Sequence, residues 1–382
     1  MQLPLSTPAR ALARLIPLLL IVGCQVTPPQ HGAATPFGPV RAESEARAER
    51  VAEMLEELYP AVQAWLPGSR SGEVEVWVQE SPALYRLGSS SYSEADGFWA
   101  EGPGRIHLRE NADSLRRTLA HELVHASLGK TWAALPGTLE EGLCDLASAQ
   151  LCPESASRMR AGRLSSAGFV TGGLRLELEL AVPKEVHTLG LGVRFTARLR
   201  LEGEDKNRVD PLGVFEQHAG LSSSTLPSDE KKAYYGLAFL VVERIEERQG
   251  VAHLYDLCAD ARRNGDGTIP TGALLESAGL DHDPESWSRA IADALGEDEL
   301  IELVRMHPSF LVEALTQLLE PCLPEVGLAR HDFDALEARL RLADGDTSID
   351  LLALPDVRLG LWSRLRPHRM TETFVEAGIL PR

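Results

Sequence analysis

The spacing of hydrophobic residues predicts helices and short strands in the first third of the chain. Residues 43–66 place apolar side chains near helical spacing with acids and arginines between them, which predicts an amphipathic helix. The following stretch Gly-Glu-Val-Glu-Val-Trp-Val-Gln-Glu alternates apolar and polar residues, as a half-buried strand does. Residues 95–110 predict two more strands joined at Gly102-Pro103-Gly104. We therefore expect a small N-terminal mixed sheet with a helix beside it.

Helical spacing returns in residues 111–130 and again from Thr138 onward. Leucines recur four or five residues apart in the first of these segments. Asn111 or Asp113 is the expected N-terminal cap, and Gly129 lies near the expected end. The segment Pro-Gly-Thr-Leu-Glu-Glu-Gly-Leu-Cys-Asp-Leu-Ala then predicts a second helix after a turn.

The rest of the chain predicts more helices, interrupted by one pair of strands. Residues 174–202 alternate strongly on both sides of a Gly-containing centre, which predicts a long β-hairpin, inserted at about 165–205. Residues 229–250 predict a long helix ending at Gly250, and residues 297–382 are mostly helical in pattern. The predicted fold class is α+β: the small sheet, then a mainly helical domain with the inserted hairpin, and a helical C-terminal region. The main domain is expected to span residues 43–296.

The N-terminus has the pattern of an export signal. Residues 1–14 carry two arginines and no acid, and an apolar run follows that is too short to span a bilayer as a helix. The run ends in Ile21-Val22-Gly23-Cys24, which resembles the lipobox of bacterial lipoproteins; the alternative is an ordinary signal with a chance cysteine. The resemblance implies a signal peptide over 1–23, lipidation of Cys24 and a flexible tether over 24–42. Because Gln25 is not aspartate, the resemblance also implies that the protein is anchored in the outer membrane of a bacterial cell envelope, where it faces the periplasm or the exterior.

Composition and charge restrict the classes of partner that the chain is expected to bind. The chain has 382 residues, of which 44% are hydrophobic, enough for a sizeable core. Its formal net charge of −18 argues against nucleic acid, which requires basic patches that neutralise phosphates. Four cysteines remain after Cys24, and an oxidising compartment permits three disulfide pairings among them; buried thiols are the alternative.

The sequence His-Glu-Leu-Val-His lies on the first of the two predicted neighbouring helices. Residues four apart are stacked neighbours on a helix, so His121 and His125 are able to present two imidazole nitrogens to one metal ion. Glu122 then projects beside the ion, where a carboxylate takes a proton from metal-bound water. The alternative is a helix with two histidines and an acid that bind no metal.

A catalytic zinc site usually has three protein ligands and one water. Glu141 on the second predicted helix is the candidate third ligand, and Glu140 is the competing one. Asp145 follows Glu141 by one helical turn, so it is a candidate acceptor for a hydrogen bond from a zinc-bound imidazole. The alternative for the two glutamates is a solvated pair favoured by the helix dipole.

These two segments together resemble the gluzincin zinc metallopeptidases, and most closely their peptidase-MA-like branch. Members have a second helix reading roughly Pro-x-Trp-Leu-x-Glu-Gly-x-Ala. The chain matches this pattern at Pro136, Leu139, Glu141 and Gly142 but departs from it with Thr138 and Cys144. The resemblance covers residues 50–295 and implies a zincin-like fold. It also implies that one of the two strands in 95–110 is an edge strand, with which an extended peptide pairs through its backbone.

A third segment, Tyr-Tyr-Gly-Leu-Ala-Phe-Leu-Val-Val, resembles a helix that carries a tyrosine in the same family. The resemblance aligns Tyr235 with that tyrosine, which donates to the oxyanion of the tetrahedral intermediate in relatives. Tyr234 is one register away and competes for the role. His218 and His253 are lesser candidates.

The sequence therefore predicts a lipid-anchored envelope enzyme that hydrolyses peptide bonds with Zn²⁺. Its substrate is a peptide or protein, Glu122 is the general base, and the lipid joins it to a membrane. The rival is a non-catalytic envelope binding or assembly lipoprotein on a peptidase-like scaffold, to which the hairpin and the unassigned C-terminal region point. A zinc-dependent hydrolase of a non-peptide substrate is a third possibility.

Overall fold

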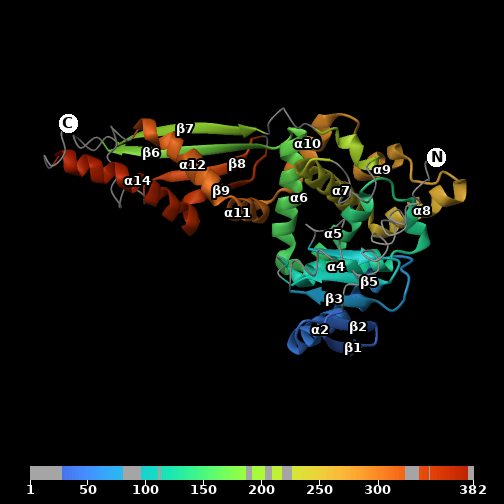
Figure 1. Ribbon diagram of the computed structural model, residues 1–382. Helices are drawn as coiled ribbons and strands as arrows, with labels where there is room; N and C mark the ends of the chain where they lie inside the picture. Colours follow the sequence, from blue (N-terminus) through green and yellow to red (C-terminus); the bar gives the residue numbers. More distant parts are fainter. Residues whose placement is uncertain are drawn as a thin grey trace, which may run out of the picture. The chain divides into compact units, whose positions relative to one another are not determined.

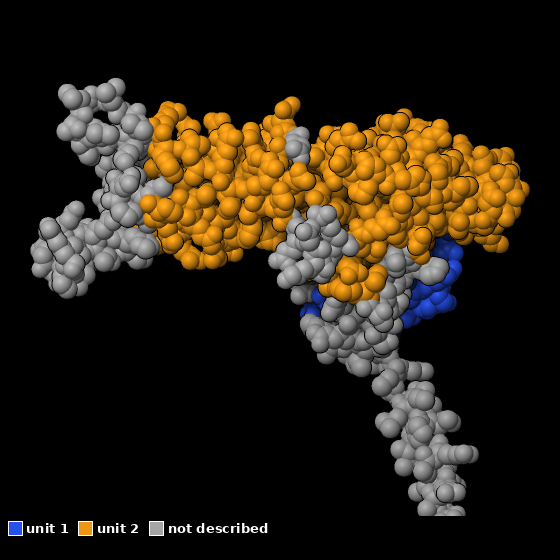
Figure 2. All heavy atoms as spheres, turned by 90° about the horizontal axis from the view of Figure 1, so that it is seen from above, with its two compact units in different colours: residues 1–129 blue, residues 130–382 orange. Residues whose placement is uncertain are grey.

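The computed structural model describes residues 28–80, 96–110, 112, 114–185, 192–202, 209–216, 226–322, 335–343 and 345–376. The fold is mixed α+β, as the sequence predicts. The chain forms two compact units, residues 1–129 and residues 130–382, which are coloured separately in Figure 2. The boundary lies between the two helices that carry the predicted metal ligands.

Unit 1 is built on a mixed sheet with the order β1-β2-β3-β5-β4 (Figure 1). Its strands are β1 (His31–Thr35), β2 (Gly38–Ala42), β3 (Glu75–Gln79), β4 (Gly97–Ala100) and β5 (Arg105–Arg109). The neighbours β2 and β3, and β3 and β5, run parallel, whereas β4 and β5 form an antiparallel hairpin. The predicted small mixed sheet is confirmed, and β4 lies at its edge.

Two helices cover this sheet. Helix α2 (Glu45–Trp65) packs on β1 and β2, helix α4 (Leu115–Ser127) packs on β4 and β5, and the two helices contact each other. Both helices were predicted from hydrophobic spacing. The prediction of the α4 cap was wrong, because Ser114 holds that position and its hydroxyl accepts from the backbone N–H of Arg117.

The tether predicted for residues 24–42 is wrong over its second half, which forms β1 and β2. Val40 and Ala42 are fully buried, and Val40 pairs with Val76 of β3. The short, small residues of this stretch gave no strand pattern by themselves. They become a strand because β3, more than 30 residues away in sequence, supplies the backbone partner.

The buried imidazole of His107 makes the stability of unit 1 depend on pH. Its ring stacks on Phe98 at 4.5 Å and meets the Trp77 ring edge-on. Burial, together with the charge of Arg105 and against an opposing effect of Glu75, lowers the pKa of His107 to about 4. The folded state thus favours the neutral ring. The contribution of His107 to stability is complete above pH 6.5, where its ring is neutral in the unfolded chain as well. This contribution is lost as the pH falls from 6.5 towards 4.

We expect that the free energy of unfolding falls by about 3 kcal/mol across this interval on account of His107, at about 1.4 kcal/mol per pKa unit. Urea unfolding at pH 7 and pH 5, followed by tryptophan fluorescence, checks this; Trp77 of unit 1 packs against His107. His107→Phe should flatten the pH slope. His31→Phe, an exposed histidine of the same unit, is the matched control, and an equal flattening in both variants would refute the assignment.

Unit 2 begins with a bundle of closely packed helices. Helices α5 (Leu139–Leu151), α6 (Ala156–Thr171) and α7 (Ser228–Gln249) contact one another. Around them lie η1 (Lys130–Ala134), η2 (Pro153–Ser155), η4 (Pro211–Phe215), α8 (Val251–Asn264), α9 (Thr271–Ala278), α10 (Pro284–Ala294) and α11 (Glu297–Met306). The predicted helices from Thr138 and over 229–250 are confirmed, with Gly250 at the C-terminal end of α7.

A second sheet completes unit 2, and it joins segments far apart in sequence (Figure 1). The predicted hairpin is confirmed as β6 (Arg175–Glu185) and β7 (Gly192–Glu202). Strands β8 (Glu337–Leu342) and β9 (Ser348–Asp350) extend it into an antiparallel sheet with the order β7-β6-β8-β9. The hairpin predicted as an insertion is therefore one half of a sheet.

The C-terminal region is only partly helical, which corrects the prediction for 297–382. It holds α11, α12 (Pro308–Leu319), η6 (Glu320–Cys322), η8 (Leu351–Ala353) and α14 (Pro355–Glu376) in addition to the strands β8 and β9. Helix α12 packs on β6 and β7 and also against α14, so it covers part of one face of the sheet. No helix in the described ranges has the length and apolarity that crossing a membrane requires. The predicted signal peptide and Cys24 lie outside the described residues.

Candidate metal centre

Helix α4 carries the His-Glu-x-x-His sequence on a helix that is buried along one side. Leu119, Leu123 and Val124 are fully buried, so the helix is fixed on the sheet of unit 1. The imidazole rings of His121 and His125 are half-buried neighbours with centroids 5.1 Å apart. The spacing thus brings two imidazole rings together on one side of α4, as predicted.

Glu122 is buried on the sheet side of the same helix. The residue is only 5% exposed, and its Cγ atom lies against the backbone of the edge strand β4. A methyl group added at Gly97 of β4 would lie 3.1 Å from Glu122 Cγ and 2.7 Å from Thr118 Cγ2. The glycine therefore allows β4 to lie directly against the predicted general base.

Replacing Gly97 by alanine tests this contact. We expect a loss of about 1–3 kcal/mol in the free energy of unfolding, because Thr118 is β-branched and adapts poorly to overpacking. Displacement of the Glu122 side chain should accompany it. Gly102→Ala in the turn of the same hairpin is the control, since nothing lies within 4 Å of its added methyl. Urea unfolding of both variants checks the prediction, and equal midpoints would contradict it.

Helix α5 of unit 2 carries the second group of predicted residues on its first turns. Glu140 and Glu141 are half-buried in the first turn, and Cys144 and Asp145 are fully buried one turn later. Thr138, which stands where the family pattern has Trp, lies before the helix and donates its backbone N–H to the Val214 carbonyl at 3.0 Å. The start of α5 is thus attached to η4.

Asp145 is held by Arg163 of α6, a residue that the sequence analysis did not single out. The Arg163 Nε and Nη2 atoms donate to the two Asp145 carboxylate oxygens at 2.6 and 3.2 Å. Burial alone would lower the pKa of the Arg163 guanidinium, but the Asp145 carboxylate, with further contributions from Glu141 and Tyr235, raises it above its ordinary value. The side chain stays charged and ties the buried carboxylate to α6.

Tyr235 of α7 joins the same group. The Arg163 guanidinium lies 5.1 Å from the centroid of the Tyr235 ring, in cation–π geometry. The backbones of α5 and α7 approach closely at Gly142, where an added methyl would come within 2.3 Å of the Ala238 carbonyl oxygen. The glycine after Glu141 thus allows α5 and α7 to pack closely, at a point three residues along each helix from Asp145 and from Tyr235.

The competing candidates lie elsewhere in unit 2. Tyr234 is buried, and its hydroxyl lies beside Gly213 of η4, where burial and nearby acids raise its pKa. His253 of α8 lies with its Nε2 atom 3.1 Å from Ser277 Oγ. His218 lies outside the described residues.

Sequence reasoning missed Arg163 because an arginine on a helix usually indicates a solvated side chain. A usable signal exists in the composition of α6, where arginines alternate with alanine, glycine and serine. Small residues allow neighbouring helices to approach, and an arginine between close helices requires an acidic partner. Arg160 of the same helix follows this rule, since it pairs with Glu243 and Glu299.

Three of the cysteines after Cys24 are buried. Cys144, Cys152 and Cys258 are free thiols, so for these three the alternative of buried thiols holds over disulfides. Burial raises the pKa of the Cys258 thiol to about 12. Cys144 differs from the other two in its position, one turn after Glu141 on α5.

The two groups belong to different units: His121, Glu122 and His125 to unit 1, and Glu141, Asp145, Arg163 and Tyr235 to unit 2. Comparisons of the chain with protein-family models, with curated proteins and with solved structures found no match.

Proposed function

We propose that the protein is a zinc-dependent peptidase in which His121 and His125 of α4 and Glu141 of α5 bind one Zn²⁺. The observation that carries the proposal is the pair of adjacent imidazoles on α4 with the buried Glu122 between them in sequence. Two imidazoles and one carboxylate are a common ligand set of catalytic zinc. We further propose that the arrangement of the helices is zincin-like.

Helix α5 carries two candidates for the third ligand, Glu141 and Cys144. Glu141 is half-buried on the first turn, where a carboxylate is accessible. Cys144 lies three residues later on the same face, and a set of His121, His125 and Cys144 is also able to hold a metal ion. We favour Glu141 because two imidazoles with one glutamate carboxylate are a common ligand set of catalytic zinc.

In the proposed reaction, Glu122, Tyr235 and Arg163 each have a separate role. A bound zinc would supply a Lewis acid that lowers the pKa of water. Glu122 accepts a proton at its carboxylate from the attacking water and then donates it to the leaving amine nitrogen. The Tyr235 hydroxyl donates a hydrogen bond to the developing oxyanion, and Arg163 holds the ring in place.

The substrate is a peptide or protein segment bound in extended form. Strand β4 is the edge of the sheet in unit 1 and lies directly against Glu122. A peptide that pairs with this edge through its backbone would have its scissile bond beside the general base. Such pairing requires no particular side chain, so the proposal concerns the extended conformation and not the sequence of the substrate.

We also propose that the protein is lipid-anchored through Cys24 in a bacterial cell envelope. The support is the sequence of the first 24 residues, with its basic start, short apolar run and lipobox-like end. Labelling with a radioactive or alkyne-tagged fatty acid in a bacterial host tests it, with Cys24→Ala as the variant that should not be labelled.

Zinc analysis of the purified protein tests the metal proposal. We expect about one zinc per chain, as in other catalytic sites, and a value well below one in His125→Ala. His282→Ala is the matched control, because His282 is exposed and lies on neither helix of the site. Equal zinc contents in the two variants would contradict the proposed ligands. One zinc without cleavage of any peptide in a mixed library would favour the non-catalytic binding protein.

A further inference from the structure

Strand β7 forms one edge of the sheet in unit 2 and is unusually long for an edge. It spans 11 residues and pairs over its whole length with β6, while in the described part of the chain its other side has no strand neighbour. Proteins generally shorten, cover or interrupt such edges, because the unpaired N–H and C=O groups accept any extended chain. A long edge is therefore a candidate site of strand addition.

Charges on one face of this sheet alternate from strand to strand. Arg198 of β7 pairs with Glu179 of β6 at 3.2 Å, Glu179 is opposite Arg339 of β8, and Arg339 is opposite Asp350 of β9. The row thus reads positive, negative, positive, negative and begins with a positive charge at β7. In the next row Glu177 of β6 binds Arg200 and Arg341 on either side.

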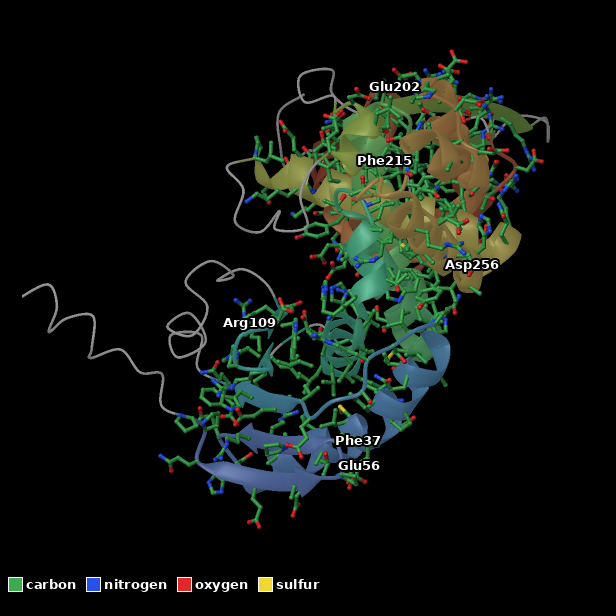
Figure 3. The ribbon with its side chains drawn as sticks, turned by 90° about the vertical axis from the view of Figure 1, so that its right-hand side faces the viewer. Phe37, Glu56, Arg109, Glu202, Phe215 and Asp256 are labelled. Carbon is green, nitrogen blue, oxygen red and sulfur yellow. The ribbon has the colours of Figure 1, made fainter. Side chains whose placement is uncertain are left out.

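The edge is therefore positive along most of its length. Arg194, Arg198 and Arg200 lie on the charged face, and the residue directly opposite Arg194 is Pro183. Glu202 at the end of the strand, which is labelled in Figure 3, reverses the sign and lies 3.7 Å from Arg175. A strand added beside β7 would continue the alternation if it carried acids opposite the arginines.

The other face of β7 is apolar and incompletely covered. Phe195 is 42% exposed, and Ala197, Leu199 and Leu201 are half-buried, whereas Leu176, Leu178 and Leu180 of β6 are buried beneath the helices. The apolar layer therefore stops short of the edge. An added strand with apolar residues at alternate positions would complete it and cover Phe195.

We propose that the outer edge of β7 binds an extended acidic segment of another protein, with acidic and apolar residues in alternation. Backbone hydrogen bonds to the edge provide the general affinity, and the arginine row selects the charge. A second copy of β7 fits less well, because a two-fold antiparallel pair centred on the strand places arginine opposite arginine, which is unfavourable. The site is separate from the proposed zinc ligands and does not depend on them.

A fluorescent nine-residue peptide of alternating valine and glutamate tests the proposal by anisotropy with the full chain. We expect saturable binding that weakens about tenfold in Arg194→Glu, since like charges then lie opposite one another. Arg339→Glu is the matched control: it makes the same charge change on the same face, but on interior strand β8. Its affinity should stay within about twofold of the wild type, because β8 offers no free edge.

Two further probes separate strand addition from simple charge attraction. The same peptide with N-methyl groups on alternate residues should not bind, because it lacks the backbone donors that pairing requires. A valine–lysine peptide should not bind either. Undiminished binding of the N-methylated peptide, equal loss in both charge variants, or attachment to phosphatidylglycerol vesicles without peptide binding would each overturn the proposal.

Discussion

Glu122→Gln is expected to lower peptide hydrolysis by roughly 10²–10⁴-fold, the range that a general acid–base contributes. Glutamine has the same shape as glutamate, so the packing of Glu122 against Gly97 of β4 should persist. It cannot accept a proton from water at neutral pH. Zinc content should therefore stay at the wild-type value while cleavage of a quenched fluorescent peptide disappears.

Glu140→Gln is the matched control for this variant. It makes the same chemical change at a half-buried glutamate beside the proposed ligand Glu141. We expect it to retain both zinc and cleavage. Cleavage that survives Glu122→Gln would exclude the proposed base, and zinc lost in Glu140→Gln would transfer the ligand role to that residue.

Arg163→Met is expected to cause the largest loss of stability, about 3–5 kcal/mol in the free energy of unfolding. The Asp145 carboxylate is fully buried, and both of its oxygens accept from Arg163. Removing the guanidinium takes away the cation that both carboxylate oxygens bind, so this pairing no longer offsets the desolvation cost of the buried charge. Urea unfolding of unit 2 measures the effect.

Two further variants show whether the buried pair is responsible. Arg198→Met removes an arginine from an exposed ion pair with Glu179, and we expect less than about 1 kcal/mol from it. Arg163→Met combined with Asp145→Leu should recover most of the loss, since the buried charge is then absent as well. A loss in Arg163→Met no larger than in Arg198→Met would show that the buried pair does not stabilise the bundle.

Features fixed by local spacing were predictable from the sequence. The histidines of α4 are neighbours because any helix brings residues four apart together, and the apolar period of this segment identifies the helix. The hairpin of β6 and β7 likewise follows from two alternating runs of sequence around a glycine-containing segment. In both cases the information lies within about 30 residues of sequence.

Features that depend on distant partners were not predictable. Residues His31–Ala42 became strands because β3 pairs with β2, and β8 became a strand because β6 offers its free edge. The Asp145–Arg163 pair was missed for the same reason: α5 and α6 meet only after packing, and no local pattern links an acid on one helix to an arginine on the other.

X-ray absorption at the zinc edge of the purified protein tests the ligand set most directly. With His121, His125 and Glu141 as ligands, the first shell contains only nitrogen and oxygen at about 2.0–2.2 Å, with the outer-shell scattering of two imidazoles. A sulfur scatterer at about 2.3 Å would instead identify Cys144 as a ligand and contradict the role of Glu141. Zinc without imidazole scattering would contradict the site as a whole.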